Sequence, residues 1–287
     1  MEINKNQRVL LSVLAHPDDE SFGMGGTLAK YAKSGTEVHL ICATRGEAGE
    51  VDPEYLAGFS SIGQLRESEL FCAVEKLGIE EVHLLGYRDS GMSGSADNNK
   101  PEALVNAPLN QVAEEITEII RRIKPQVILT FDPLGGYRHP DHIYIHQAAT
   151  KAFYLAGDPS FKSSYPPHAP GKLYYHTISR HFIRFTVRLL CLLGKDPEHY
   201  GKNKDIDLTQ LAGDDIPIHA RIDYSIVREE KNAAAACHAS QGGKGMTRGF
   251  IRWITWLLRV KPEDQFMQAF PEPNTGDQVI SDLFTGI

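Results

Sequence analysis

The chain has 287 residues, of which 41% are hydrophobic, and a formal net charge of −7. This length suits one large α/β core with a small appendage, and the negative charge argues against bulk attraction to nucleic acid. Residues 1–7 lack a charged-then-apolar signal layout, and the apolar run after them is too short to span a bilayer. We expect a cytoplasmic protein without stable membrane insertion that acts on a small molecule. A homo-oligomer is not excluded.

Short apolar runs alternate with helix-like stretches through the first half of the chain, which is typical of βαβ units. The predicted strands are residues 9–15, 38–44, 82–86 and 127–131. The predicted helices are residues 24–33, 64–77, 109–123 and 141–155. Gly35 and Gly78 stand where C-terminal helix caps are expected. We therefore expect a Rossmann-like α/β fold with a mostly parallel sheet flanked by helices.

The residue composition changes after residue 155, where proline-rich loops precede a predicted strand at 172–179. We expect residues 1–155 to form a catalytic core that carries the metal site. Residues 156–287 should form a smaller C-terminal elaboration that completes the core and the substrate pocket. Two apolar, basic stretches at 184–193 and 250–260 either pack on the core as helices, which is favoured, or touch a membrane or partner.

Cysteines and isolated histidines give no further site. Cys42, Cys72, Cys191 and Cys237 are widely scattered without C-x-x-C spacing, so we expect buried free thiols rather than a disulfide framework or a cysteine zinc site. Eight histidines lack partners at ligand spacing and are interpreted as ordinary core or surface residues: His39, His83, His146, His168, His176, His181, His199 and His219.

The box His16-Pro17-Asp18-Asp19-Glu20 directly follows the first apolar run. Side chains just past the carboxyl end of a parallel strand face the crevice where α/β proteins bind ligands. His16 and Asp19 can point to one metal ion, while Asp18 lies near the metal's water as general base. In the alternative interpretation, Asp18 or Asp19 caps a helix.

A second box, His139-Pro140-Asp141-His142, follows the fourth apolar run. One of its imidazoles can complete the metal set while the other faces the reacting carbonyl, and Asp141 can orient and charge His139. A solvated histidine-rich loop is the alternative. Together the two boxes supply three metal ligands, an open position for water and a base, which a zinc hydrolase requires. Two histidines and a carboxylate also suit Fe²⁺.

Several segments resemble the LmbE/PIG-L family of zinc-dependent N-acetylglucosaminyl de-N-acetylases. The general family motifs are matched by residues 15–20, 44–49 and 139–142. Residues 64–67, 87–92 and 135–137 are similar, more narrowly, to the mycothiol-pathway branch. Members of that branch deacetylate a glucosaminyl-inositol precursor or cleave mycothiol conjugates.

The resemblance implies a role for each matching residue. Zinc would be bound by His16, Asp19 and His142. Catalysis would involve Asp18 as general base, His139 as oxyanion stabiliser with Asp141 behind it, and Tyr137 as a group that polarises the amide carbonyl. The sugar contacts of the family fall on Arg66 and Asp89, with Met92 lining the pocket.

Alternatives stay open for these substrate residues. Arg66 can instead form an exposed helix salt bridge, and Asp89 can instead shape a turn. Arg45 and Glu47, after the second predicted strand, either bind substrate or pair with each other. His238 ends a helix-like segment, residues 231–241, that resembles a family motif, and we expect it to reach the active-site rim.

The sequence thus predicts a metal-dependent hydrolase that removes the N-acetyl group from a small molecule containing N-acetylglucosamine. An amidase that cleaves a larger glucosaminyl amide, such as a thiol conjugate, is the alternative within the enzyme class. A non-catalytic metal- or sugar-binding protein would not need Asp18. A nucleotide-binding module is disfavoured because His-Pro-Asp-Asp stands where a phosphate-binding G-x-G-x-x-G is expected.

Overall fold

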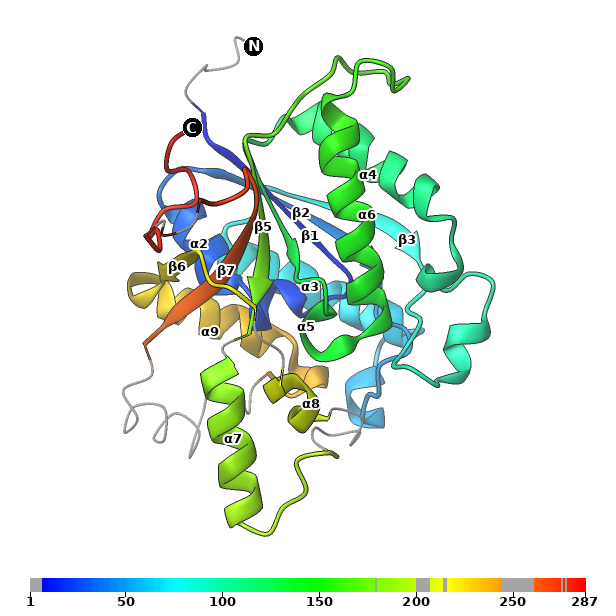
Figure 1. The fold of residues 1–287 in the computed structure, drawn as a ribbon. Helices are drawn as coiled ribbons and strands as arrows, with labels where there is room; N and C mark the ends of the chain where they lie inside the picture. The colour runs from blue at the N-terminus through cyan, green and yellow to red at the C-terminus, as the bar shows by residue number, and fades with distance from the viewer. Residues whose placement is uncertain are drawn as a thin grey trace.

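The computed structural model describes residues 7–178, 180–199, 207–213, 216–243, 261–274, 276 and 278–287, with the backbone alone at 181 and 182. Within these ranges a seven-stranded sheet of order β3-β2-β1-β4-β5-β7-β6 forms the centre of the molecule. Helices cover both faces of the sheet, with α4 and α6 on one side and α2, α3 and α9 on the other (Figure 1). The predicted α/β architecture is confirmed.

The strands β1 to β5 match their predicted positions within two residues, whereas β6 and β7 were not predicted. Their bounds are β1 Val9–Leu14, β2 Glu37–Thr44, β3 Glu81–Tyr87, β4 Val127–Phe131, β5 Lys172–Thr177, β6 Ala220–Asp223 and β7 Glu263–Phe270. The pairings from β3 through β5 are parallel, whereas β7 is antiparallel to both β5 and β6. The mostly parallel sheet is therefore confirmed, and its antiparallel part comes from the second half of the chain.

The helices of the first half also lie where periodicity places them. The α-helices are α1 Asp19–Phe22, α2 Gly25–Lys33, α3 Ile62–Leu77, α4 Leu109–Ile123, α5 Gly135–Arg138, α6 Pro140–Gly157, α7 Arg180–Leu192, α8 Leu208–Gly213 and α9 Arg228–Cys237. Short 3₁₀ turns are η1 Pro53–Leu56, η2 Ala96–Asn99, η3 Leu104–Asn106, η4 Ser225–Val227 and η5 Ala239–Gln241. Gly78 adopts φ 73° and caps α3, as predicted.

Central strands β1 and β4 are buried along their whole length. Helices on both faces explain why these strands are continuous apolar runs rather than alternating patterns. The two strands are direct neighbours, with Leu10 opposite Val127 and Ser12 opposite Leu129. Because their carboxyl ends meet at one edge, the segments that follow them are brought together.

The second half of the chain supplies β5, β7 and β6 to the same sheet. Helix α7 packs on α8, where Ile183 meets Leu208 and Leu211 in a cluster separate from the main core. The apolar stretch at 184–193 therefore packs mainly on α8, and Leu192 at its end is 84% exposed. The stretch at 250–260 lies outside the described residues. In the described part of the chain, no helix is long and apolar enough to cross a bilayer.

The expectation of four unpaired thiols is wrong. Cys72 in α3 and Cys237 at the end of α9 form a disulfide, with their Cα atoms 5.8 Å apart. The two cysteines are 165 residues apart in sequence and are brought together by the packing of α3 on α9, which their spacing could not predict. Cys42 is buried and free as expected, whereas Cys191 is free but exposed.

Candidate metal centre and active site

The two histidine boxes converge at the carboxyl ends of β1 and β4. The ring centroids of His16 and His139 lie 4.5 Å apart, and those of His16 and His142 lie 5.2 Å apart. His139 caps the start of α6, so His142 lies in the first turn of that helix and faces the end of β1. Residues more than 120 positions apart therefore share one buried site.

The proposed ligand atoms have the spacing of a zinc site. Nδ1 of His16 lies 3.2 Å from Nε2 of His142. Asp19 places Oδ1 3.2 Å from Nε2 of His142 and Oδ2 3.5 Å from Nδ1 of His16. Tetrahedral zinc with bonds of about 2.0–2.1 Å separates its ligand atoms by about 3.4 Å. The three side chains thus fit the ion, although His139 also lies within 4.8 Å of both other imidazoles.

Carboxylates behind His16 fix the orientation of its ring. Nε2 of His16 lies 3.1 Å from Oδ2 of Asp141 and 3.4 Å from Oδ1 of Asp89. Metal-bound histidines commonly donate their second N–H to such a carboxylate, which leaves the other nitrogen free for the metal. Burial alone would lower the pKa of His16, but Asp89, Asp141 and Asp19 raise this pKa well above its ordinary value. The surroundings of His16 therefore favour positive charge.

Asp141 does not orient His139 as expected, and this prediction is corrected. Nδ1 of His139 accepts a hydrogen bond from the backbone N–H of Asp141 at 3.2 Å. The Asp141 carboxylate instead contacts His16 and accepts from the backbone N–H of Ser90 at 2.9 Å. His139 occupies the N-cap of α6, so its ring accepts a hydrogen bond from the first turn of that helix. The Asp141 carboxylate is therefore free to contact His16 at the end of β1.

His139 is held as a neutral donor. Burial lowers the pKa of His139 well below its ordinary value, and neighbouring His16 and His142 lower this pKa further. Because Nδ1 accepts from the backbone, the proton of the neutral ring belongs on Nε2. This donor N–H stands in the same buried cluster as the metal ligands.

Asp18 follows the first ligand in an unusual backbone conformation, with φ 116°. Its carboxylate makes no helix-capping bond, which excludes the capping interpretation for this side chain. Oδ2 instead accepts from Nη2 of Arg66 at 2.7 Å. Burial raises the pKa of Asp18 to about 6, although Arg66 opposes this rise. A carboxylate poised near neutrality suits general-base chemistry.

Arg66 is buried within the site rather than exposed on its helix. Its guanidinium also donates to the carbonyl oxygens of Pro17 at 2.5 Å and Gly46 at 3.0 Å. Gly46 adopts φ 68°, and a Cβ at that position would lie 2.0 Å from Nη1 of Arg66. Glycine is therefore required there both by the backbone conformation and by the approach of the arginine.

A buried pair, Glu20 and His238, supports Asp18 from behind. Oε2 of Glu20 accepts from the backbone N–H of Asp18 at 2.9 Å, and Oε1 lies 2.7 Å from Nε2 of His238. Burial opposes both charges, but each partner offsets it, lowering the pKa of Glu20 and raising the pKa of His238. His238 has no exposed surface and lies inside the protein instead of at the rim. Glu20 was missed, although it completes the first box.

Asp89 shapes a turn, as one interpretation had it, and also contacts His16, which was not predicted. Oδ1 accepts from the backbone N–H of Gly91 at 2.8 Å, which shapes the turn after β3, and the same oxygen faces His16. Burial would raise the pKa of Asp89, but His16 and these hydrogen bonds lower this pKa strongly. Oε2 of Glu47 accepts from the Asp89 N–H at 3.1 Å. Met92, in the same turn, is half-buried.

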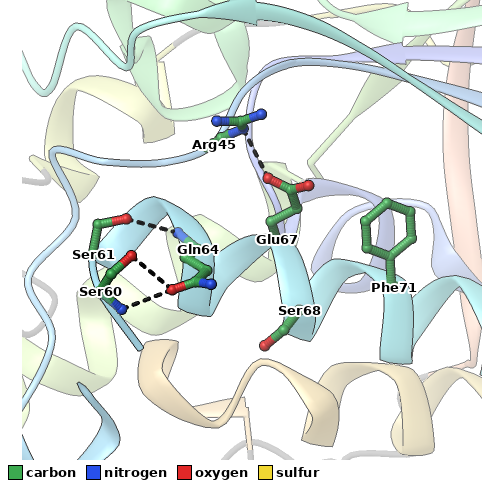
Figure 2. Close-up of a pocket in the computed structure, with 7 residues that line it drawn as sticks. All are labelled: Arg45, Ser60, Ser61, Gln64, Glu67, Ser68 and Phe71. Carbon is green, nitrogen blue, oxygen red and sulfur yellow. Dashed lines mark hydrogen bonds and ion pairs between the residues drawn. The ribbon is translucent and has the colours of Figure 1, made fainter. Parts of the chain in front are cut away.

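Arg45 points away from the metal ligands. Its Nε lies 2.8 Å from Oε2 of Glu67, as Figure 2 shows, so Arg45 and Glu47 do not pair with each other. Arg45 and Glu67 belong to a shallow hollow of about 470 Å³ on the outer face of α3. The hollow is lined by Arg45, Ser60, Ser61, Gln64, Glu67, Ser68 and Phe71. No proposed metal ligand lines this hollow.

Tyr137 completes the wall beside the second box. Its ring stands edge-on to His142, with centroids 5.0 Å apart. Burial raises the pKa of Tyr137, so its phenol remains a hydrogen-bond donor. Oδ1 of Asp132 accepts from the backbone N–H groups of Leu134 and Gly136 and so holds this loop. The sequence analysis did not identify Asp132 as a site residue, although its position directly after β4 could have indicated this role.

Comparisons with known proteins agree with this arrangement. The family model described as "PIG-L: GlcNAc-PI de-N-acetylase" matches residues 11–153, which include both boxes. A 1D-myo-inositol 2-acetamido-2-deoxy-alpha-D-glucopyranoside deacetylase from Streptomyces griseus is 38% identical over 82% of this chain and 75% of its own length. The protein of the same name from Streptomyces scabiei is 37% identical over 97% of this chain and 89% of its own length.

Solved structures share the fold at lower identity. N,N'-diacetylchitobiose deacetylase from Pyrococcus horikoshii has a TM-score of 0.62 and 21% identity, covering 92% of this chain and 84% of its own. The hydratase GalB from Pseudomonas putida also has a TM-score of 0.62, with 18% identity over 93% of this chain and 98% of its own. The fold therefore hosts more than one chemistry. The level and extent of sequence identity show that the chain belongs to the PIG-L family of de-N-acetylases.

Proposed function

We propose that this protein is a metal-dependent hydrolase that removes the N-acetyl group from a small molecule containing N-acetylglucosamine. The observation that carries the proposal is the set of three ligand atoms spaced for zinc with Asp18 directly beside them. A protein that only bound metal or sugar would not need a carboxylate with a pKa of about 6 at that place. The names of the relatives favour a glucosaminyl inositol as the substrate class.

His16, Asp19 and His142 are the ligands in this proposal, and Zn²⁺ is the ion. When bound, the ion supplies Lewis acidity that polarises the amide carbonyl and makes water more acidic. Fe²⁺ shares this donor preference and remains the second candidate. The carboxylates of Asp141 and Asp89 keep His16 oriented for coordination.

Asp18 takes the proton of the attacking water. Arg66 holds the Asp18 carboxylate in place through Oδ2, while the Glu20 carboxylate fixes the Asp18 backbone. We assign His238 to this supporting pair as a positioning residue instead of a substrate contact. The strained Asp18 backbone is thus fixed from two sides, which keeps the base aimed at one point.

His139 and Tyr137 stabilise the oxyanion that forms when water adds to the amide carbon. Nε2–H of neutral His139 and the Tyr137 hydroxyl both donate, and neither group loses a proton in doing so. Donors fixed in advance in a buried site commonly lower a barrier by several kcal/mol. Protonated Asp18 then returns its proton to the amine nitrogen as the C–N bond breaks, which releases acetate and the free amine.

The sugar-binding residues remain predictions. Arg66 and Asp89 lie at the site, where they form hydrogen bonds to protein atoms, and Met92 is half-buried in the turn after Asp89. Arg45 lies farther out, in the hollow on α3, where it can reach a large substrate group, whereas Glu47 contacts the Asp89 backbone at the site. The two-part division at residue 155 and the cytoplasmic location also remain proposals. The Cys72–Cys237 disulfide argues against the latter, since disulfides are rare in reducing compartments.

The substrate proposal is tested by incubating the zinc-loaded protein with an N-acetylglucosaminyl inositol, N-acetylglucosamine and a thiol-conjugated glucosaminyl amide. We expect acetate release to be fastest from the inositol glycoside. Faster amine release from the thiol conjugate would assign the protein to the amidase alternative. No amine release from any of the three compounds, with metal bound, would favour the binding-protein alternative.

A further inference from the structure

A second group of metal-ligating side chains lies at the opposite end of the sheet from the active site. His39 of β2 pairs in register with Glu81 of β3, and His83 follows two residues later. Residues two apart on a strand share one face, so all three side chains project from the same face of the sheet. One ligand atom from each of the three lies within 4.8 Å of the others.

The orientation of His39 leaves one nitrogen free and aimed at this group. Nε2 of His39 lies 2.8 Å from Oε1 of Glu37, which accepts its N–H. The other ring nitrogen, Nδ1, is buried without a hydrogen-bond partner. It faces Oε2 of Glu81 at 3.8 Å, which is beyond hydrogen-bond distance, so a cation between the two atoms could bind both. A carboxylate behind a histidine in this way is the usual support of a metal-bound imidazole.

His83 presents a second nitrogen to the same carboxylate. Its Nδ1 lies 3.4 Å from Oε1 of Glu81, and its ring is parallel to that of His39 with centroids 5.7 Å apart. Both imidazoles are more than nine-tenths buried, whereas Glu81 is about half exposed. The rings are thus fixed by the sheet, and the carboxylate can close on an ion from solvent.

Arg122 of α4 supplies the positive charge at this place. Its Nη2 lies 3.0 Å from Nδ1 of His83 and 3.5 Å from Oε1 of Glu81. The Arg122 side chain is 43% exposed, so it can turn into solvent when another cation arrives. A compact divalent ion that displaces the guanidinium would also satisfy the His39 nitrogen that Arg122 leaves unpaired.

We propose that His39, His83 and Glu81 form a second binding site for a divalent transition-metal ion such as Zn²⁺, with Glu37 supporting His39. Two imidazoles and a carboxylate with room for water form a known zinc donor set. Five strand residues, about 17 Å, separate His39 from the end of β2 near the active site. An ion here would link edge strand β3 to β2 and would take no part in amide hydrolysis.

This site could not be predicted from residue spacing because His39 and His83 are distant along the chain. The interpretation of these two histidines as residues without ligand partners is therefore corrected by the sheet register. The interpretation of the other six histidines as ordinary core or surface residues stays a prediction.

The test is Zn²⁺ binding to the chelator-treated full chain in a Cys191→Ser background, which removes the exposed free thiol. We expect two Zn²⁺ per chain. His83→Gln should bind one Zn²⁺ and keep hydrolase activity, whereas His142→Ala should bind one and lose activity. One Zn²⁺ in the parent protein, or two in a His83→Gln variant with intact helical circular dichroism, would overturn the proposal.

Variants at exposed positions test the same site if a substitution at the buried His83 impairs folding. Glu37→Gln should lower the affinity for the second Zn²⁺ by about 10–100-fold. Arg122→Gln should tighten this binding by about tenfold or more, because Arg122 contacts His83 and its competing charge is lost. Lys124→Gln removes a charge of the same sign at the end of α4 and should change the binding less. Equal effects of Arg122→Gln and Lys124→Gln would contradict the assigned position of the ion.

Discussion

Arg66 and Asp18 form a partly buried ion pair, with Nη2 of the arginine 2.7 Å from Oδ2 of the aspartate. The arginine comes from α3 and the aspartate from the segment after β1, so the pair joins a helix to the strand end that carries the metal ligands. The same guanidinium binds the Pro17 carbonyl. Arg66 therefore controls both the position and the charge of the proposed base.

Replacing Arg66 with methionine should reduce turnover strongly. The variant leaves the Asp18 carboxylate buried without its counter-charge, so its pKa should rise and less base should be ionised at neutral pH. We expect kcat/KM for acetate release to fall about 10²-fold or more. Arg66→Lys should recover part of the rate because it retains the charge but not the planar contacts. Equal rates for wild type and Arg66→Met would show that Arg66 does not control the proposed base.

Gly46→Ala should impair the same pair indirectly. The added methyl group would lie 2.0 Å from Nη1 of Arg66, so the guanidinium must move away from Asp18. The overpacking should cost about 1–3 kcal/mol of unfolding free energy and should lower turnover as well. Gly35→Ala is the matched control, because Gly35 has a similarly positive φ with open space around it. Similar activity losses in both variants would show that backbone strain, not displacement of Arg66, is responsible.

His146 should make the fold less stable in mild acid. Nδ1 of His146 lies 2.9 Å from the Phe131 carbonyl, and burial lowers the pKa of this imidazole below its ordinary 6.5. Below pH 6.5 the unfolded chain binds the proton first, so this contribution to stability falls as the pH decreases toward the folded pKa. His146→Gln should lose less stability over this pH range than wild type does. The measurement is the urea midpoint of both proteins at pH 7.5 and 5.5. An equal drop in midpoint for the two proteins would contradict the prediction.

The Cys72–Cys237 disulfide should stabilise the packing of α3 on α9. The bond closes a long loop, and removal of such a link typically costs about 2–5 kcal/mol. Reductant should therefore lower the Tm of wild type but leave the Cys72→Ser variant unchanged. Thiol titration of the denatured, unreduced protein should give two free thiols, from Cys42 and Cys191. Four titrated thiols would show that the cysteines are unpaired.

The sequence predicted those features that depend on the strand ends. Continuous apolar runs identified β1 and β4, and the crevice rule for parallel sheets then placed His16 and His142 together. Hydrophobic periodicity located α4 to the residue because its apolar face is regular and packs against the core.

Features that depend on packing between helices could not be predicted in this way. The Cys72–Cys237 bond and the Glu20–His238 pair each join residues more than 160 positions apart, and neither has a local signal of pairing. The orientation of the Asp141 carboxylate was missed for a different reason. It is decided by how His139 begins α6, which residue identity alone does not fix.

The central claim is that Asp18 acts as a base beside a metal held by the two boxes. Its most direct test is acetate release from an N-acetylglucosaminyl inositol by zinc-loaded wild type and Asp18→Asn, with bound metal measured in both. We predict that the variant keeps its metal and loses about 10²–10⁴-fold in kcat. A metal-loaded Asp18→Asn variant with the wild-type rate would contradict the account.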